Sequence, residues 1–212
     1  MSVVAALAST SLRRRRTAAS RRHPLRPFAA HTPVVIVPGL RDSGPRHWQT
    51  LWHRRYPEFL RVAPVDVDVP ALDEWAFAIA DVLAKRPPAL VVAHSFGCLA
   101  TLRAAKSHGC TLAGALLAAP ADPDRFGIDD LLPHAPLSFP VTLVASTDDP
   151  WLKLVKAGLL ASRWGCRLEC VGALGHINAE SGLGEWSPGF ALLRDLAERA
   201  AAAGTLAPRA AA

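Results

Sequence analysis

The chain has 212 residues, a net charge of +6 at pH 7 and an apolar content of 50%. This length suits one domain with a substantial core and is short for two. No apolar segment reaches the roughly 20 residues that a transmembrane helix needs, so we expect a soluble protein that does not enter the membrane.

The positive charge is concentrated at the N-terminus. Residues 1–31 contain seven arginines and no acidic residue, which leaves 17 basic and 18 acidic side chains in residues 32–212. Because a nucleic-acid groove needs basic side chains clustered on the folded surface, this distribution argues against a nucleic-acid partner. We expect residues 1–31 to be a disordered basic extension and the protein to be cytoplasmic. The same composition also fits an organellar transit peptide or a start codon placed too far upstream.

From residue 32 onward, short apolar runs alternate with longer amphipathic stretches. This order predicts βα units that form a three-layer sandwich around a mostly parallel sheet. The predicted strands are 32–38, 61–69, 88–94, 112–119, 140–146 and 166–172. The predicted helices are 46–55, 71–86, 97–107, 151–163 and 188–202. We therefore expect one α/β domain over residues 32–203 and a disordered tail at 204–212.

The long connection at 119–139 and the four cysteines give further limits on the function. The connection at 119–139 has about twenty residues where two to six are usual, so it is either a wall of a binding site or a plain surface crossover. The four cysteines are expected to be reduced, because the chain has no export signal. Cys166 and Cys170 lack the second Cys or His pair of a zinc site, and we expect no metal ion.

Ser95 stands between a predicted strand and a predicted helix, in the run PALVVAHSFGCLATLRAA at 88–105. A serine in a sharp strand-to-helix turn is lifted above the sheet edge where ligands bind, and the turn needs small residues two before and two after it. Here these are Ala93 and Gly97, so A-H-S-F-G stands in place of the usual G-x-S-x-G. The pattern predicts a nucleophile, although Ser-x-Gly after an apolar run is also compatible with a helix N-cap.

An acid and a histidine follow the serine in the chain order that this architecture uses. Asp148 and Asp149 come after the fifth predicted strand, and His176 comes after the sixth. An imidazole can take the serine proton near neutral pH, and a carboxylate fixes its tautomer. We favour Asp149 as the acid because Pro150 after it suits a turn that leaves the strand. Asp148 could instead serve the turn by accepting backbone N–H groups.

Acyl transfer also needs hydrogen-bond donors for the oxyanion. We expect one donor to be the backbone N–H of Phe96, directly after the serine. The other should be the N–H of Leu40, in the loop after the first strand, where Gly39 lets the backbone turn freely. Trp151 and Trp186 flank the acid and histidine segments and are candidates for the pocket wall.

The remaining histidines and tryptophans have structural interpretations. His94 is expected to brace the turn at Ser95 and not to act as the base, because consecutive strand residues face opposite sides. Surface positions are expected for His47, His53, His108 and His134. Positions in the core are expected for Trp48, Trp52 and Trp75.

Four segments, VVIVPGLRDSGPRHWQTLW, VVAHSFG, STDDPW and GHIN, occur in this order within residues 33–200. In this arrangement the chain resembles the small α/β-hydrolases of the retinoblastoma-binding-protein type, a group of serine hydrolases and esterases. The resemblance implies a single-domain α/β-hydrolase fold with nucleophile, acid and base at Ser95, Asp149 and His176. Ala93 departs from the glycine that most members of the superfamily carry.

These observations predict a cofactor-free serine hydrolase that cleaves a small-molecule carboxylic ester, or an amide, through an acyl-enzyme on Ser95. Two alternatives stay open. A hydrolase fold can serve mainly for protein interaction, as the family name suggests, although the sequence indicates no particular protein partner. The same three residues could also transfer the acyl group to an alcohol or amine.

Overall fold

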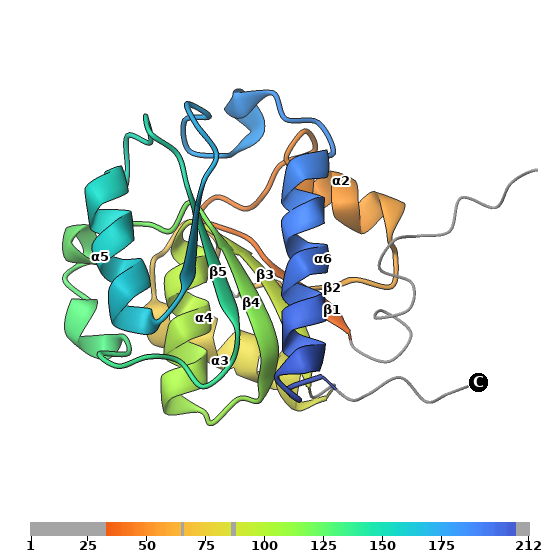
Figure 1. Ribbon diagram of the computed structural model, residues 1–212, viewed down its shortest axis with the longest axis vertical. Helices are drawn as coiled ribbons and strands as arrows, with labels where there is room; N and C mark the ends of the chain where they lie inside the picture. The colour runs from red at the N-terminus through yellow and green to blue at the C-terminus, as the bar shows by residue number, and fades with distance from the viewer. Residues whose placement is uncertain (1–32, 65, 86–87, 207–212) are drawn as a thin grey trace, which may run out of the picture.

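The computed structural model describes residues 33–64, 66–85 and 88–206 (Figure 1). Its six strands form one sheet in the order β2-β1-β3-β4-β5-β6, and every neighbouring pair is parallel. The strands are β1 Val34–Val37, β2 Leu60–Arg61, β3 Ala89–His94, β4 Leu112–Ala118, β5 Val141–Ala145 and β6 Arg167–Cys170. The basic extension expected at 1–31 lies outside the described residues.

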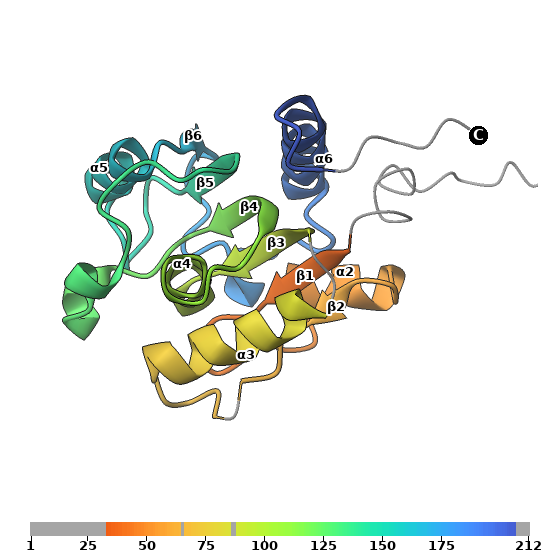
Figure 2. The same cartoon turned by 90° about the horizontal axis from the view of Figure 1, so that it is seen from below.

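Helices cover both faces of this sheet. They are α2 Trp48–Arg55, α3 Leu72–Ala84, α4 Phe96–Ser107, α5 Leu154–Trp164 and α6 Ser187–Ala202, with short 3₁₀ turns η1 Pro123–Phe126, η2 Asp129–Leu131 and η3 Ala179–Ser181. Helices α3, α4 and α5 pack on one face, and α2 and α6 pack on the other (Figure 2). The predicted three-layer α/β sandwich is therefore confirmed. In the part of the chain that the structure describes, no helix is long and apolar enough to cross a bilayer.

The central strands are uniformly apolar because each contributes to two cores. In β3, Val91 and Ala93 belong to the core under α3, α4 and α5, whereas Leu90 and Val92 belong to the core under α2 and α6. Successive strand residues point to opposite faces, so a strand covered on both sides needs a continuous apolar run. The core positions expected for three tryptophans are confirmed, since Trp48, Trp52 and Trp75 are each 1% exposed.

The strand predicted at 61–69 is largely absent, because pairing with β1 is limited to β2 at Leu60–Arg61. The alternation of valine and aspartate imitates a strand, but the segment instead forms local turns. The Asp66 side chain accepts the N–H of Asp68, and the N–H of Ala71 bonds to the carbonyl of Val69. Aspartate favours such turns because its short side chain competes with the sheet for backbone donors.

The predicted tail at 204–212 begins too early. Thr205 and Leu206 belong to the folded domain, because the Thr205 hydroxyl donates to the carbonyl of Ala113 and Leu206 is only 2% exposed. In the sequence, a threonine and a leucine that follow an alanine-rich helix carry no local signal that they pack against the domain. Residues 207–212 lie outside the described residues.

Gly97 allows α4 to approach the end of β1. A Cβ added at this position would lie 2.1 Å from the carbonyl oxygen of Pro38 and 2.9 Å from a side-chain carbon of Val37. Both distances are shorter than van der Waals contact, and the Pro38 oxygen belongs to the backbone and cannot rotate away. The sequence requirement for a small residue after the serine therefore reflects the packing of α4 on β1.

We expect Gly97→Ala to lower the free energy of unfolding by about 1–3 kcal/mol or more, as overpacking of a dense core does. Gly158→Ala in α5 is the matched control, because its Cβ would meet only Leu168 Cδ2 at 4.0 Å. The control should raise stability by about 0.5–1 kcal/mol through helix propensity. Urea unfolding of both variants measures the difference, and a neutral Gly97→Ala would contradict the packing argument.

Candidate active site

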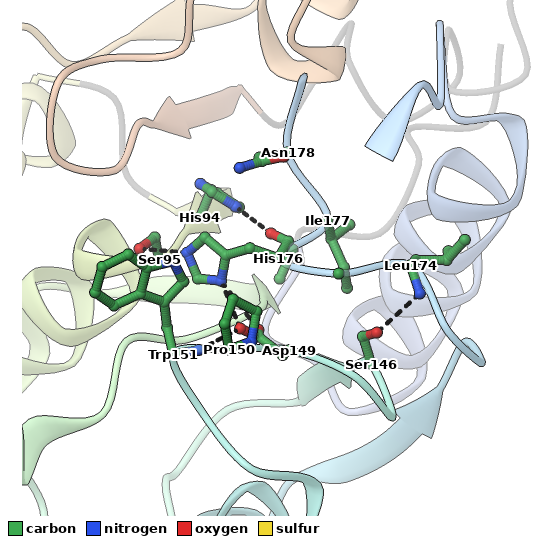
Figure 3. Close-up of polar contacts among 12 residues, drawn as sticks. His94, Ser95, Ser146, Asp149, Pro150, Trp151, Leu174, His176, Ile177 and Asn178 are labelled. Atoms are coloured by element: carbon green, nitrogen blue, oxygen red, sulfur yellow. Dashed lines mark hydrogen bonds and ion pairs between the residues drawn. The ribbon is translucent and has the colours of Figure 1, made fainter. Parts of the chain in front are cut away.

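Three polar side chains meet beyond the carboxyl ends of β3, β5 and β6 (Figure 3). Ser95 directly follows β3, Asp149 lies in the loop after β5, and His176 lies in the loop after β6. The Nε2 atom of His176 is 2.9 Å from Ser95 Oγ. Its Nδ1 atom is 3.1 and 3.0 Å from the two carboxylate oxygens of Asp149. The structure thus brings together the three residues that the sequence singled out.

The backbone of Ser95 has a conformation that few non-glycine residues adopt. Its φ is 53° and its ψ is −124°, between a strand that ends at His94 and a helix that begins at Phe96. Strained backbone of this kind persists only where surrounding contacts enforce it. Although Ser95 occupies the N-cap position of α4, its hydroxyl makes no capping bond. The hydroxyl is therefore left to contact His176.

The carboxylate partner of His176 is buried. Asp149 is 3% exposed, and its Oδ1 also accepts the N–H of Trp151 at 2.8 Å. A carboxylate at Nδ1 selects the tautomer with a proton on that nitrogen, so Nε2 is the acceptor that faces Ser95. This is the arrangement in which an imidazole can remove the hydroxyl proton.

Asp148 has a different environment. It is exposed, and its Oδ1 accepts the Ser146 hydroxyl at 2.6 Å and the Gly175 N–H at 2.8 Å. These hydrogen bonds, with that from Ser146 the stronger influence, lower the pKa of Asp148. Asp148 therefore ties the loop of β5 to the loop that carries His176, and it does not contact the imidazole.

His94 contacts the backbone of the histidine loop. Its Nε2 donates to the carbonyl of His176 at 2.9 Å, and the side chain is 5% exposed (Figure 3). Burial, followed by repulsion from His47 and His176, holds the pKa of His94 well below its usual value. His94 thus stays neutral, and it braces the loop of His176 through this bond and through its ring, whose centroid is 4.9 Å from that of His176.

The surface position expected for His47 is wrong. His47 is 4% exposed and caps α2, where its Nδ1 accepts the N–H of Gln49 at 3.2 Å. Its ring packs edge-on against His94, with the centroids 4.7 Å apart. Burial, followed by repulsion from Arg61, lowers the pKa of His47 to about 4. A polar residue at a helix start looks exposed in the sequence, but this first turn of α2 lies under the site.

The loop after β1 passes directly beside the serine. A Cβ added at Gly39 would lie 2.9 Å from the Cβ of Ser95, so glycine is needed here for close approach. The backbone turn that we expected at Gly39 occurs later in the loop, where Arg41 and Asp42 have φ of 65° and 60°. Within the described part of the chain, no protein acceptor pairs with the N–H of Leu40 or Phe96.

The two tryptophans proposed for the pocket wall differ. Trp151 is 53% exposed, and its ring centroid is 6.3 Å from that of His176. The expectation that Trp186 lines the pocket is wrong. This residue is 3% exposed and packs against Trp48 and Trp52 in the core under α2 and α6. Gly189 allows this burial, since a Cβ there would lie 2.1 Å from the Trp186 ring.

Arg125 in η1 also reaches the site. Its guanidinium lies over the Trp151 ring, 5.3 Å from the centroid, and donates to the carbonyl of Pro150 at 3.1 Å. The long connection at 119–139 therefore supports one wall of the site. The sequence offered no signal for this contact, because an arginine in an irregular loop has no periodicity that assigns it a partner.

A shallow cavity of about 330 Å³ lies beside His176, on the side of Trp151. It is lined by Pro150, Trp151, Ala173, Leu174, Gly175, His176, Asn178, Glu180 and Ser181. Over residues 33–64, 66–85 and 88–206, no three His, Cys, Asp or Glu side chains come close enough to hold a metal ion.

We expect His47→Asn to reduce the loss of stability in acid. Between pH 6.5 and about 4, the unfolded chain binds a proton that folded His47 excludes, so the free energy of unfolding falls as the pH falls. Asn does not titrate and is also a good N-cap. Urea unfolding at pH about 7.5 and about 4.5 should show a loss about 2–3 kcal/mol smaller in the variant. Equal losses in the two proteins would contradict this assignment.

Solved structures of other proteins share this fold. A YdeN-like hydrolase from Pectobacterium atrosepticum is 39% identical, with a TM-score of 0.79 over 85% of this chain and 96% of that one. The ydeN gene product of B. subtilis is 21% identical, with a TM-score of 0.65 over 78% and 98% of the two chains. Est1E from Butyrivibrio proteoclasticus, solved with ferulic acid, is 14% identical, with a TM-score of 0.61 over 81% and 90%. The last two show the fold alone.

Sequence comparison with curated proteins finds no match. The family model described as serine hydrolase matches residues 34–195, which is most of the chain. Together with the 39% identical hydrolase, this match identifies the fold as that of the α/β-hydrolases. The chain belongs to the serine hydrolase family.

Proposed function

We propose that this protein is a serine esterase in which Ser95 is the nucleophile, His176 the general base and Asp149 the acid. The observation that carries the proposal is the continuous contact from Ser95 Oγ through the imidazole to the buried carboxylate, at 2.9 and 3.0 Å. A serine hydroxyl is a poor nucleophile unless a base removes its proton during attack. His176 Nε2 lies where such a base must lie.

In the first half-reaction, Ser95 Oγ attacks the ester carbonyl carbon as its proton passes to His176 Nε2. The tetrahedral intermediate collapses when the C–O bond to the leaving alcohol breaks and His176 returns the proton to that oxygen. Water then attacks the acyl-enzyme with the same base, which releases the acid and restores Ser95. No step needs a cofactor or metal.

The buried charge of Asp149 supports this sequence. When His176 takes the proton it becomes an imidazolium, which the carboxylate 3.0 Å away stabilises because both side chains are largely shielded from solvent. The neighbouring His94 and His47 are held neutral by burial, so they add no positive charge that would oppose protonation of His176. The electrostatic environment thus favours the charge that forms during attack.

For the oxyanion, we propose the backbone N–H groups of Phe96 and Leu40. Phe96 is the first residue of α4, where backbone N–H groups have no partner within the helix. The close approach of Gly39 to Ser95 brings the loop that contains Leu40 beside the nucleophile. Two such donors would bind the negative oxygen of the intermediate more strongly than the neutral carbonyl oxygen.

We further propose that Trp151 forms a wall for a small-molecule ester. Its exposed ring borders the cavity next to His176, and the Arg125 contact holds it in place. The two more specific segments of the resemblance to the retinoblastoma-binding-protein type, PGLRDSGPRHW and STDDPW, both include residues that lie at this site, and we propose this finer assignment on their sequence pattern.

A fluorophosphonate probe should label the wild-type protein and should fail to label Ser95→Ala. The probe reacts with an activated serine oxygen, so loss of that oxygen removes the reaction while leaving the buried fold unchanged. Labelling is measured by gel fluorescence or intact mass, with hydrolysis of short nitrophenyl esters in parallel. Persistent labelling of Ser95→Ala would overturn the assignment of the nucleophile.

Asp149→Asn should lower kcat by about 10⁴-fold, because an amide favours the wrong imidazole tautomer. Asp148→Asn is the matched control, and we expect it to stay within about tenfold of the wild type, since an amide oxygen can still accept the N–H of Gly175. Steady-state hydrolysis of a nitrophenyl ester compares them. Similar losses in the two variants would contradict the role of Asp149.

A further inference from the structure

The first turn of α2 is bonded to backbone in the segments that carry the site. Trp48 Nε1 donates to the carbonyl of Ile177 at 2.8 Å. The Gln49 amide donates to the carbonyls of Val37 at 2.9 Å and Val92 at 3.1 Å. Both side chains are buried, Trp48 at 1% exposure and Gln49 at 0%. Sequence reasoning placed Trp48 in the core and assigned no role to Gln49.

The Trp48 contact controls a strained part of the histidine loop. His176 stands between Gly175 with φ of 55° and Ile177 with φ of 49°. A β-branched residue at positive φ is costly and persists only when its surroundings enforce it. Ile177 is fully buried, and the indole N–H of Trp48 holds its carbonyl. This bond acts one residue away from the imidazole.

The Gln49 contacts act on the other side of the site. Val37 lies three residues before Leu40, and Val92 lies three residues before Ser95. One amide group therefore joins the carboxyl-terminal halves of β1 and β3, the two strands that lead to the proposed oxyanion donors. The Gln49 carbonyl oxygen also accepts the Ser43 hydroxyl at 2.6 Å, which ties down the middle of the loop that contains Leu40.

We infer that Trp48 and Gln49 are positioning residues of the active site. Trp48 sets the position of the His176 imidazole through Ile177, and Gln49 sets the separation of the Leu40 and Phe96 N–H groups through Val37 and Val92. The inference rests on the proposed function for its kinetic consequences. Simple core packing would explain the burial of these residues, but it would not require polar contacts with these particular carbonyls.

Trp48→Phe is tested against Trp52→Phe, a matched control one turn along α2. Trp52 is equally buried, and its Nε1 donates at 2.6 Å to the carbonyl of Glu185, which lies beyond η3, nearer α6 than His176. Each variant removes one indole N–H and keeps an aromatic ring. We expect a similar loss of thermal stability in both, and a fall in kcat of at least about tenfold, with little change in KM, only in Trp48→Phe. A tenfold fall in kcat is the effect expected from the loss of one hydrogen bond.

A second readout does not depend on turnover. A proton shared between an imidazole Nδ1 and a carboxylate gives a downfield proton NMR signal, which we expect in the wild type and in Trp52→Phe. In Trp48→Phe that signal should shift or broaden. Equal kcat and an unchanged signal in the two variants would overturn the inference for Trp48. An inert wild type whose signal still changes in Trp48→Phe would instead refute the esterase proposal alone.

Gln49→Met tests the other contact, because methionine has a similar length and no N–H. A trifluoromethyl ketone forms a tetrahedral adduct with the serine and places an oxyanion at the donors. We expect its affinity to fall at least about tenfold while KM and the downfield signal are retained. If Gln49→Met does not fold, Ser43→Ala removes only the bond to the Gln49 oxygen and should weaken the same inhibitor several-fold. Unchanged inhibitor affinity in the folded variants would refute the role of Gln49.

Discussion

The close packing of α4 against the end of β1 is the constraint on which the site depends. Gly97 leaves no room for a Cβ beside the carbonyl of Pro38, and α4 begins at Phe96, two residues after β3 ends. Ser95 is consequently held at a positive φ, and its hydroxyl projects beyond the sheet instead of capping the helix. The nucleophile and the proposed donor Phe96 flank this contact, and Gly39 adds a second close approach beside Ser95.

Much of this arrangement could be predicted because its signals are local. Strands covered on both faces need continuous apolar runs, and residues after parallel strands meet at one edge, so Ser95, Asp149 and His176 could be placed from their positions in the chain. Ala93 shows that one methyl group at the turn is tolerated, since it is fully buried in β3 while the turn at Ser95 retains its strained conformation.

The remaining features depend on contacts between distant segments, which no local pattern encodes. The burial of His47 and Gln49 results from the position of α2 beneath the loops, and the contact between Arg125 and Trp151 joins two irregular segments. The alternating valines and aspartates before α3 imitate a strand, but turn formation by Asp66 prevails. Tertiary contacts decide the first two cases, and local turn formation decides the third.

The three proposed catalytic groups are anchored in different layers of the molecule. Ile177, next to the base, is packed in the core beneath α2 and α6, whereas Leu152, shortly after the acid, is packed in the core beneath α3, α4 and α5. The nucleophile directly follows β3, a strand that contributes to both cores. Loosening of either helical layer would therefore separate the acid from the base before the sheet itself unfolds. Catalytic turnover should then be lost before the sheet unfolds.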